Sequence, residues 1–137
     1  MLPKIITGGN FKDTRGVIRY NNNFDYSLIK RMYTIENNDV SFERGWQGHK
    51  IEKRWFSVIQ GCFDIQVIKI DNWEKPSKKL EIINFTIDSE TMDILYVPNG
   101  YITNIKSLQK GSKLLSMSDY RLNEIIDDYR LAIEYFK

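Results

Sequence analysis

The chain has 137 residues, 42% of them hydrophobic and 13% aromatic, which is enough for a single domain spanning 1–137 to bury a core. This composition excludes disordered, collagen-like and disulfide-scaffold proteins. A net charge of +2, from 20 Lys and Arg against 18 Asp and Glu, gives no field that would bind nucleic acid or an anionic membrane. The first residues lack the apolar run of a signal peptide, and no stretch approaches the ~18 apolar residues of a membrane span. We therefore expect a cytoplasmic protein.

Alternating side chains predict β-strands through most of the chain. In order, the predicted strands cover residues 16–20, 30–35, 55–59, 63–70, 80–87, 93–97, 101–105 and 113–118. Residues 13–16 predict a turn into the first of these strands, and Gly61, between the third and the fourth, predicts a hairpin. Cys62 lies beside this glycine in an apolar run, so we interpret it as a packing residue.

The C-terminal segment follows a different pattern, because its apolar residues are spaced as on a helix. Asn123 is suited to cap a helix, and the spacing after it predicts a helix over 123–136. Many short strands followed by one helix are typical of an all-β sandwich or barrel. Closing the sheet into a barrel removes exposed edges and leaves a mouth in which a ligand can bind.

Residues 44–61 are the most informative segment of the sequence. They resemble the first motif of the cupins, in which a strand carries His-x-His and then Glu and ends at a glycine. Gly45 and Gly61 match the glycines of this frame, and His49 matches the second histidine. Gln47 stands where the first histidine would be.

The remaining ligand positions of the cupin frame are also altered. Lys53 or Arg54 stands where the acidic ligand would be, and in the second motif, over 98–103, Thr103 stands at the last histidine. A transition-metal site needs about three or four good ligands, and a cation among them would repel the ion. We therefore predict that the chain binds no metal.

Within the cupins, the chain resembles the WxcM-like family of nucleotide-linked 4-keto-6-deoxyhexose 3,4-ketoisomerases, which are related to the dTDP-sugar epimerases. Four short pieces match in order: Asp13-x-Arg15-Gly16, Ile29-Lys30-Arg31-x-Tyr33, Arg44-Gly45-x-x-x-His49-Lys50 and Ser118-Asp119-Tyr120. The resemblance implies an RmlC-like jelly-roll barrel, a homodimer that exchanges N-terminal strands, and a dTDP-linked keto-deoxysugar as the substrate. It places the chain in deoxysugar synthesis for surface polysaccharide.

A metal-free ketoisomerase needs a general base, a proton donor and groups that stabilise the enediolate oxygens. His49 is the only histidine of the chain, and its type has an unperturbed pKa near 6.5, so it is our candidate for the base, the alternative being a hydrogen-bonded histidine without a catalytic role. Tyr33 is the candidate acid, the alternative being a packing role. No cofactor is required, because the ketone already acidifies the neighbouring C–H bond.

Further residues are candidates for contacts with the substrate. The cationic and polar ones could bind phosphate, an oxyanion or sugar hydroxyls, with an ordinary surface position as the alternative for the two arginines. The aromatic ones could stack on a base or a sugar or lie at an interface. The candidates are Arg31, Arg44, Gln47, Thr103, Trp55 and Tyr96. Phe56 is expected in the core.

Two functions remain open on the sequence. The first is a metal-independent isomerase or epimerase of sugar nucleotides, favoured by His49 and the matching Arg-Gly pairs. The second is a non-catalytic cupin that binds a sugar nucleotide or another carbohydrate, or an accessory subunit. Gln47 and Thr103 favour the second, because neither can carry a proton as histidine does.

Overall fold

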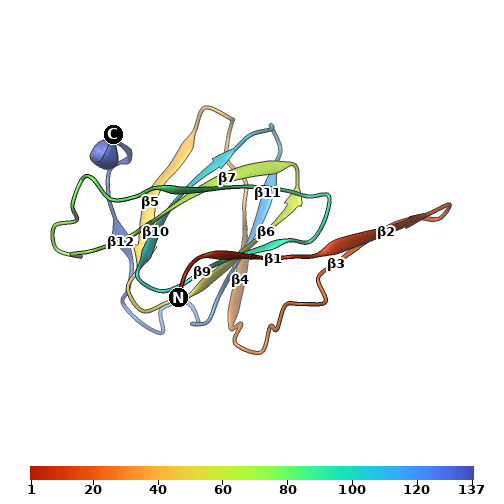
Figure 1. The fold of residues 1–137 in the computed structure, drawn as a ribbon, viewed down its shortest axis with the longest axis horizontal. Coiled ribbons are helices and arrows are strands. Elements are labelled where there is room, and N and C mark those ends of the chain that lie inside the picture. The colour runs from red at the N-terminus through yellow and green to blue at the C-terminus, as the bar shows by residue number, and fades with distance from the viewer.

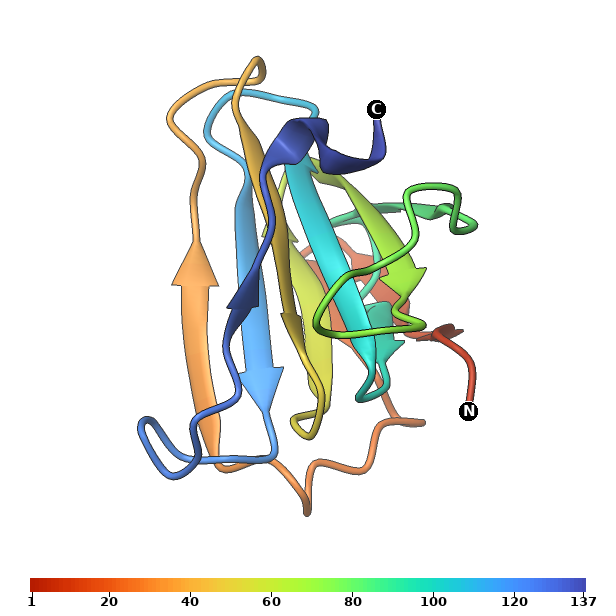
Figure 2. The same cartoon turned by 90° about the vertical axis from the view of Figure 1, so that its left-hand side faces the viewer.

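The computed structural model describes residues 1–137 and shows two five-stranded antiparallel sheets that face each other (Figures 1 and 2). The strands of the first sheet are, in spatial order, β1 (Lys4–Ile6), β9 (Ile94–Val97), β6 (Arg54–Gln60), β11 (Lys113–Ser118) and β4 (Arg31–Ile35). Those of the second are β12 (Tyr129–Arg130), β5 (Glu43–His49), β10 (Tyr101–Ser107), β7 (Cys62–Lys69) and β8 (Ile83–Asp88). A separate hairpin pairs β2 (Gly9–Asp13) with β3 (Gly16–Tyr20).

The main core lies between the two sheets. Inward-facing side chains alternate with outward-facing ones along each strand, as period-two strands require. Phe56, Leu95 and Leu114 from the first sheet and Phe63 and Ile65 from the second are fully buried in one cluster. The core role predicted for Phe56 is confirmed.

All eight predicted strands overlap strands of the structure, so the all-β prediction is confirmed. The hairpin predicted at Gly61 is wrong. The chain does turn there, but β6 pairs with β9 and β11 while β7 pairs with β8 and β10, so Gly61 carries the chain from one sheet to the other. Its φ of 81° and its close approach to Ser112 leave no room for a side chain.

The helix predicted over 123–136 is also wrong. The segment contains the short strand β12 and ends in a single turn of 3-10 helix, η1 (Ile133–Phe136). Asn123 does not cap a helix but has a positive φ of 62°. Ile133 and Phe136 instead cover the outer face of the second sheet, where Phe136 meets Trp46 with ring centroids 5.3 Å apart.

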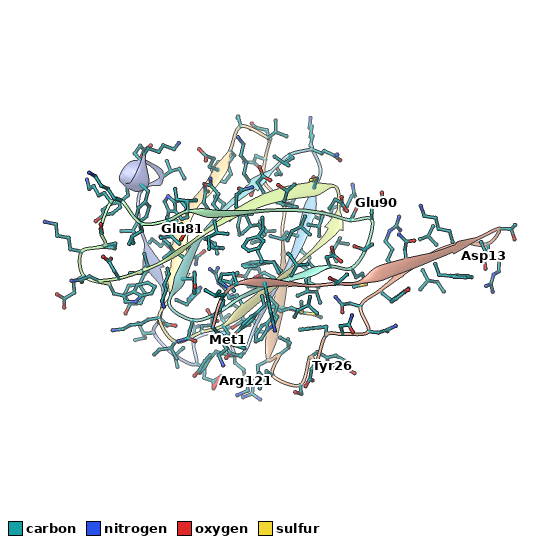
Figure 3. The ribbon with its side chains drawn as sticks, viewed as in Figure 1. Met1, Asp13, Tyr26, Glu81, Glu90 and Arg121 are labelled. Carbon is teal, nitrogen blue, oxygen red and sulfur yellow. The ribbon has the colours of Figure 1, made fainter.

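The β2–β3 hairpin extends away from the two sheets as an arm (Figure 1), and Figure 3 shows Asp13 at its tip. The sequence predicted the turn and β3 but not β2. The arm leaves Phe11 and Ile18 exposed, at 56% and 61% of their surface.

The chain contains no helix with the length and apolar character that a membrane span requires.

Candidate functional site

His49 is the last residue of β5 and points, like Gln47, to the inner side of the second sheet. β5 pairs with β10 so that Gln47 faces Thr103 and His49 faces Tyr101. His49 is 9% exposed and lines a polar cavity of about 250 Å³. Residues 121–130, which follow β11 and return to pair with β5, form the other wall of this cavity.

The Nδ1 nitrogen of His49 lies between two hydrogen-bond acceptors. It is 2.7 Å from the carbonyl oxygen of Asp127 and 2.9 Å from Oε2 of Glu52. Because neither oxygen can donate, Nδ1 carries the proton. Nε2 makes no hydrogen bond within the chain and is not fully buried. In the neutral ring its lone pair is therefore accessible from the cavity.

Glu52 is a buried carboxylate, 8% exposed, and was not among the sequence candidates. Its second oxygen, Oε1, accepts a hydrogen bond from the Ser118 hydroxyl. Burial raises the pKa of Glu52, but the hydrogen bonds from His49 and Ser118 and the nearby positive charge of Arg54 outweigh it, so that the pKa is lowered overall. An ionised Glu52 orients the imidazole and stabilises the charge that forms when His49 takes a second proton.

Asp127 holds the short segment between His49 and Glu52. Its Oδ1 accepts the backbone N–H of Lys50 at 2.9 Å, and its Oδ2 accepts those of Ile51 and Glu52 at 2.8 Å each. The side chain is buried, with the residue only 6% exposed. Asp127 therefore contacts both members of the His49–Glu52 pair.

The cavity wall carries three guanidinium groups, which belong to Arg31, Arg121 and Arg130. Figure 3 shows Arg121 at the edge of the barrel, on a loop far from the arm. Such groups suit the oxygens of a phosphate or an enediolate. The prediction that Arg31 belongs to the pocket agrees with this placement.

Gln47 and Asp128 form a second polar pair in the same cavity. Nε2 of Gln47 donates to Oδ1 of Asp128 at 2.9 Å, and Nε of Arg130 donates to Oδ2 at 3.0 Å. Burial raises the pKa of Asp128, but these two hydrogen bonds and the neighbouring Arg130 and His49 outweigh it and lower the pKa. Asp128 is therefore an ionised acceptor that can bind sugar hydroxyls.

Arg54 and Thr103 lie deeper in the barrel. Nη2 of Arg54 lies 3.1 Å from the hydroxyl of Thr103 and 3.3 Å from the carbonyl oxygen of Gln47. Arg54 thus occupies the space among the cupin ligand positions, and a buried cation there does not suit a metal ion. No group of three or more His, Cys, Asp or Glu side chains is arranged to hold a metal.

The remaining sequence candidates lie outside the cavity. Tyr33 is on β4, beside Arg31, whose guanidinium lies 4.7 Å from the centre of its ring. Arg44 is exposed and donates to Asn37. Trp55 and Tyr96 pack against each other on the outer face of the first sheet, with ring centroids 5.3 Å apart, so a ligand at His49 would not reach them.

Sequence reasoning missed the residues that complete the site. Glu52 lies three residues after His49, a spacing that does not place two side chains on the same face of a strand. Asp127, Asp128 and Arg130 fall in the segment predicted to be a helix. Ser118 lay in one of the four matching pieces, although no role was assigned to it.

The fold and this cavity define an RmlC-like cupin. The dTDP-4-dehydrorhamnose 3,5-epimerase of Bacillus anthracis, solved with TDP and pyrophosphate, superposes with a TM-score of 0.75 at 13% identity, over 96% of this chain and 79% of that one. The profile of the WxcM-like, C-terminal family (FdtA) matches residues 2–137, and the chain belongs to this family. No curated protein sequence gives a significant match.

Two further solved structures are similar over nearly the whole chain. The WlaRB TDP-quinovose 3,4-ketoisomerase of Campylobacter jejuni has a TM-score of 0.70 and 21% identity, over 98% of this chain and 96% of that one. A histidine-to-asparagine variant of the 3,4-ketoisomerase QdtA of Thermoanaerobacterium thermosaccharolyticum, in complex with TDP-4-keto-6-deoxyglucose, has a TM-score of 0.72 and 20% identity, over 98% and 91%. At these identities the likeness establishes the fold.

Proposed function

We propose that this chain is a metal-independent sugar-nucleotide isomerase that moves the keto group of a dTDP-linked 4-keto-6-deoxyhexose from C4 to C3. The observation that carries the proposal is the His49–Glu52 pair at the wall of a polar cavity. An imidazole with Nδ1 bonded to a carboxylate and Nε2 free is a suitable general base. Membership of the family and the ligands of the similar structures support the choice of substrate.

The proposed reaction begins when Nε2 of His49 removes the proton from C3 of the sugar. The electrons of the C3–H bond form a C3–C4 double bond, and the carbonyl oxygen at C4 becomes the enediolate oxygen. The proton of the C3 hydroxyl then passes to this oxygen. Finally Nε2 returns a proton to C4, which leaves a ketone at C3 and a hydroxyl at C4.

The other cavity residues have roles that follow from their charge. Arg31 stabilises the enediolate oxygens, while Arg121 and Arg130 bind the diphosphate. Gln47 and Asp128 bind sugar hydroxyls. Tyr33, next to Arg31 but not in the cavity wall, stays a prediction as the acid of the hydroxyl proton transfer.

The test is to incubate the protein with dTDP-4-keto-6-deoxyglucose in D₂O and to follow both product formation and labelling by NMR. A ketoisomerase gives the 3-keto product, with deuterium at C3 of recovered substrate or at C4 of product, whereas an epimerase labels C3 and C5. His49→Asn should slow the reaction by about 10²- to 10⁴-fold, the usual contribution of a general base. Unchanged turnover in this variant would remove His49 from the mechanism.

The second candidate function is a non-catalytic sugar-nucleotide binder. Gln47 favours it, because the amide at the first motif position is bonded to Asp128 and cannot carry a proton. Calorimetric binding of TDP without any turnover or label would support this candidate and contradict the isomerase.

We also propose that the chain forms a homodimer through the β2–β3 arm. An isolated two-stranded hairpin is at best marginally stable in water. The exposed Phe11 and Ile18 lie directly opposite each other on this arm, and a second copy of the chain would bury them.

A further inference from the structure

Asp127 is the one residue that contacts both His49 and Glu52 from a distant part of the chain. It is 78 positions from His49 in the sequence and 75 from Glu52. Its main chain accepts the Nδ1 proton of His49, and its side chain accepts the backbone N–H of Glu52. Four hydrogen bonds therefore join this residue to residues 49–52.

The three N–H groups that Asp127 accepts have no other partner. Residues 50–52 lie between β5 and β6, outside both strands, and none of their N–H groups donates to a backbone carbonyl oxygen. Without the carboxylate these groups would have to turn toward water, and the N–H of Glu52, whose hydrogen bond is buried, would be the most costly to leave unpaired. The segment that carries Glu52 would then adopt another conformation.

We propose that Asp127 is a positioning residue of the proposed isomerase, which sets both the proton location on His49 and the place of Glu52. The proposal rests on the function proposed above. Asp127 links the two walls of the cavity, because it precedes Asp128 and Arg130, whose side chains also line the cavity. Tyr129 and Arg130 are held by the pairing of β12 with β5, so substitution of the Asp127 side chain should displace the base more than the binding groups.

Substitutions at Asp127 should have graded effects. Asp127→Ala removes both carboxylate oxygens and with them all three hydrogen bonds from the backbone N–H groups. Asp127→Asn can place its single oxygen at the Oδ2 position, where it still accepts hydrogen bonds from the N–H groups of Ile51 and Glu52, but its NH2 group then faces the N–H of Lys50, which loses its acceptor. Asp93→Ala is the matched control, because Asp93 accepts the backbone N–H of Gly8 at 2.8 Å and does not line the cavity.

The first readout needs no substrate. Since His49 is the only histidine, ¹⁵N NMR of its ring reports the tautomer without interference from any other residue. In the wild type and in Asp93→Ala we expect the neutral ring to be protonated at Nδ1. In Asp127→Ala we expect a mixture of tautomers, and in Asp127→Asn a smaller change.

The second readout is turnover. Asp127→Ala should lower kcat by roughly 10- to 100-fold, as expected when catalytic groups are misplaced, with KM changed less than twofold. A folded Asp127→Ala with an unchanged tautomer and kcat would overturn the proposal, and if that variant does not fold, the same result in Asp127→Asn would do so. If the wild type shows no turnover, the proposed isomerase fails, and a tautomer that is unchanged in the variants would still refute the positioning role.

Discussion

Nδ1 of His49 lies 2.9 Å from Oε2 of Glu52, and the other oxygen of Glu52 is held by the hydroxyl of Ser118 on β11. The contact joins the last residue of β5, in one sheet, to a loop that is anchored on the other sheet. Both side chains are about nine-tenths buried, at 11% and 9% exposure. A carboxylate in this position fixes the ring and leaves Nε2 as the only nitrogen that can exchange a proton with a ligand.

Glu52→Gln should slow turnover by about 10²-fold, within the range of acid–base contributions. The amide can still accept from Nδ1, but it lacks the negative charge that stabilises the imidazolium formed in the proton transfer. The measurement is kcat for the proposed 3,4-keto migration, with Glu134→Gln, on the exposed C-terminal turn, as the control. A Glu52→Gln enzyme as fast as the wild type would show that the pair does not act in catalysis.

Acid should weaken the folded state partly through Glu52. Its pKa is lower in the folded protein than the usual 4.5, so its stabilising contribution is present above the unfolded-state pKa and is lost as the pH falls through the folded-state value. The destabilisation caused by Glu52→Gln, measured by urea unfolding, should therefore be largest near neutral pH and shrink toward pH ~3.

The pKa of Asp119 is shifted in the opposite direction to that of Glu52. Burial raises its pKa more than the hydrogen bond from the backbone N–H of Lys53 lowers it, so the protonated form is favoured in the fold. Its contribution is present below the unfolded-state pKa and is lost as the pH rises through the folded-state pKa. Asp119→Asn should therefore gain stability relative to the wild type as the pH rises. Parallel pH curves for the two variants would contradict this assignment of signs.

The strands were predictable because a half-buried sheet imposes a period of two on the sequence. The alternation in β4 and β7 reflects one more buried and one less buried face. The same period of two places Gln47 and His49, two residues apart, on the same side of β5. The family motif identified the positions of Gln47, His49 and Thr103 as cupin site positions. It could not identify the hydrogen-bond partner of Gln47, since Asp128 lies 81 positions away in the sequence.

The C-terminal segment shows why a periodic pattern alone can mislead. Ile126, within the predicted helix 123–136, is fully exposed, whereas Ile133 and Phe136 pack on the second sheet. Backbone pairing of β12 with β5 and the hydrogen bonds of Asp127 outweigh the weak helical preference of a short segment. Half of the cavity wall was missed for this reason.

Thr103→Val should destabilise the fold by about 1–3 kcal/mol, the usual cost of leaving a buried polar group without its partner. The variant keeps the volume of the side chain but removes the oxygen that accepts from the buried Arg54. Thr34→Val, on the exposed side of β4, is the control and should change stability by less than about 0.5 kcal/mol. Unfolding free energies from urea titration decide the matter, and equal values for the two variants would mean that Arg54 does not depend on Thr103.

Ile18→Asp should convert the proposed homodimer into a monomer. Ile18 is 61% exposed and lies opposite Phe11 on the arm, so an aspartate there costs the isolated chain little but would bury a charge in the proposed interface. Arg19→Ala, next to it on the same strand, is the matched control, because it changes the arm without adding a buried charge. Light scattering after size exclusion should give a dimer mass for the wild type and Arg19→Ala and a monomer mass for Ile18→Asp. A wild type that is monomeric, or an Ile18→Asp variant that stays dimeric, would show that the arm does not hold two copies together, and its exposed apolar residues would then need another partner.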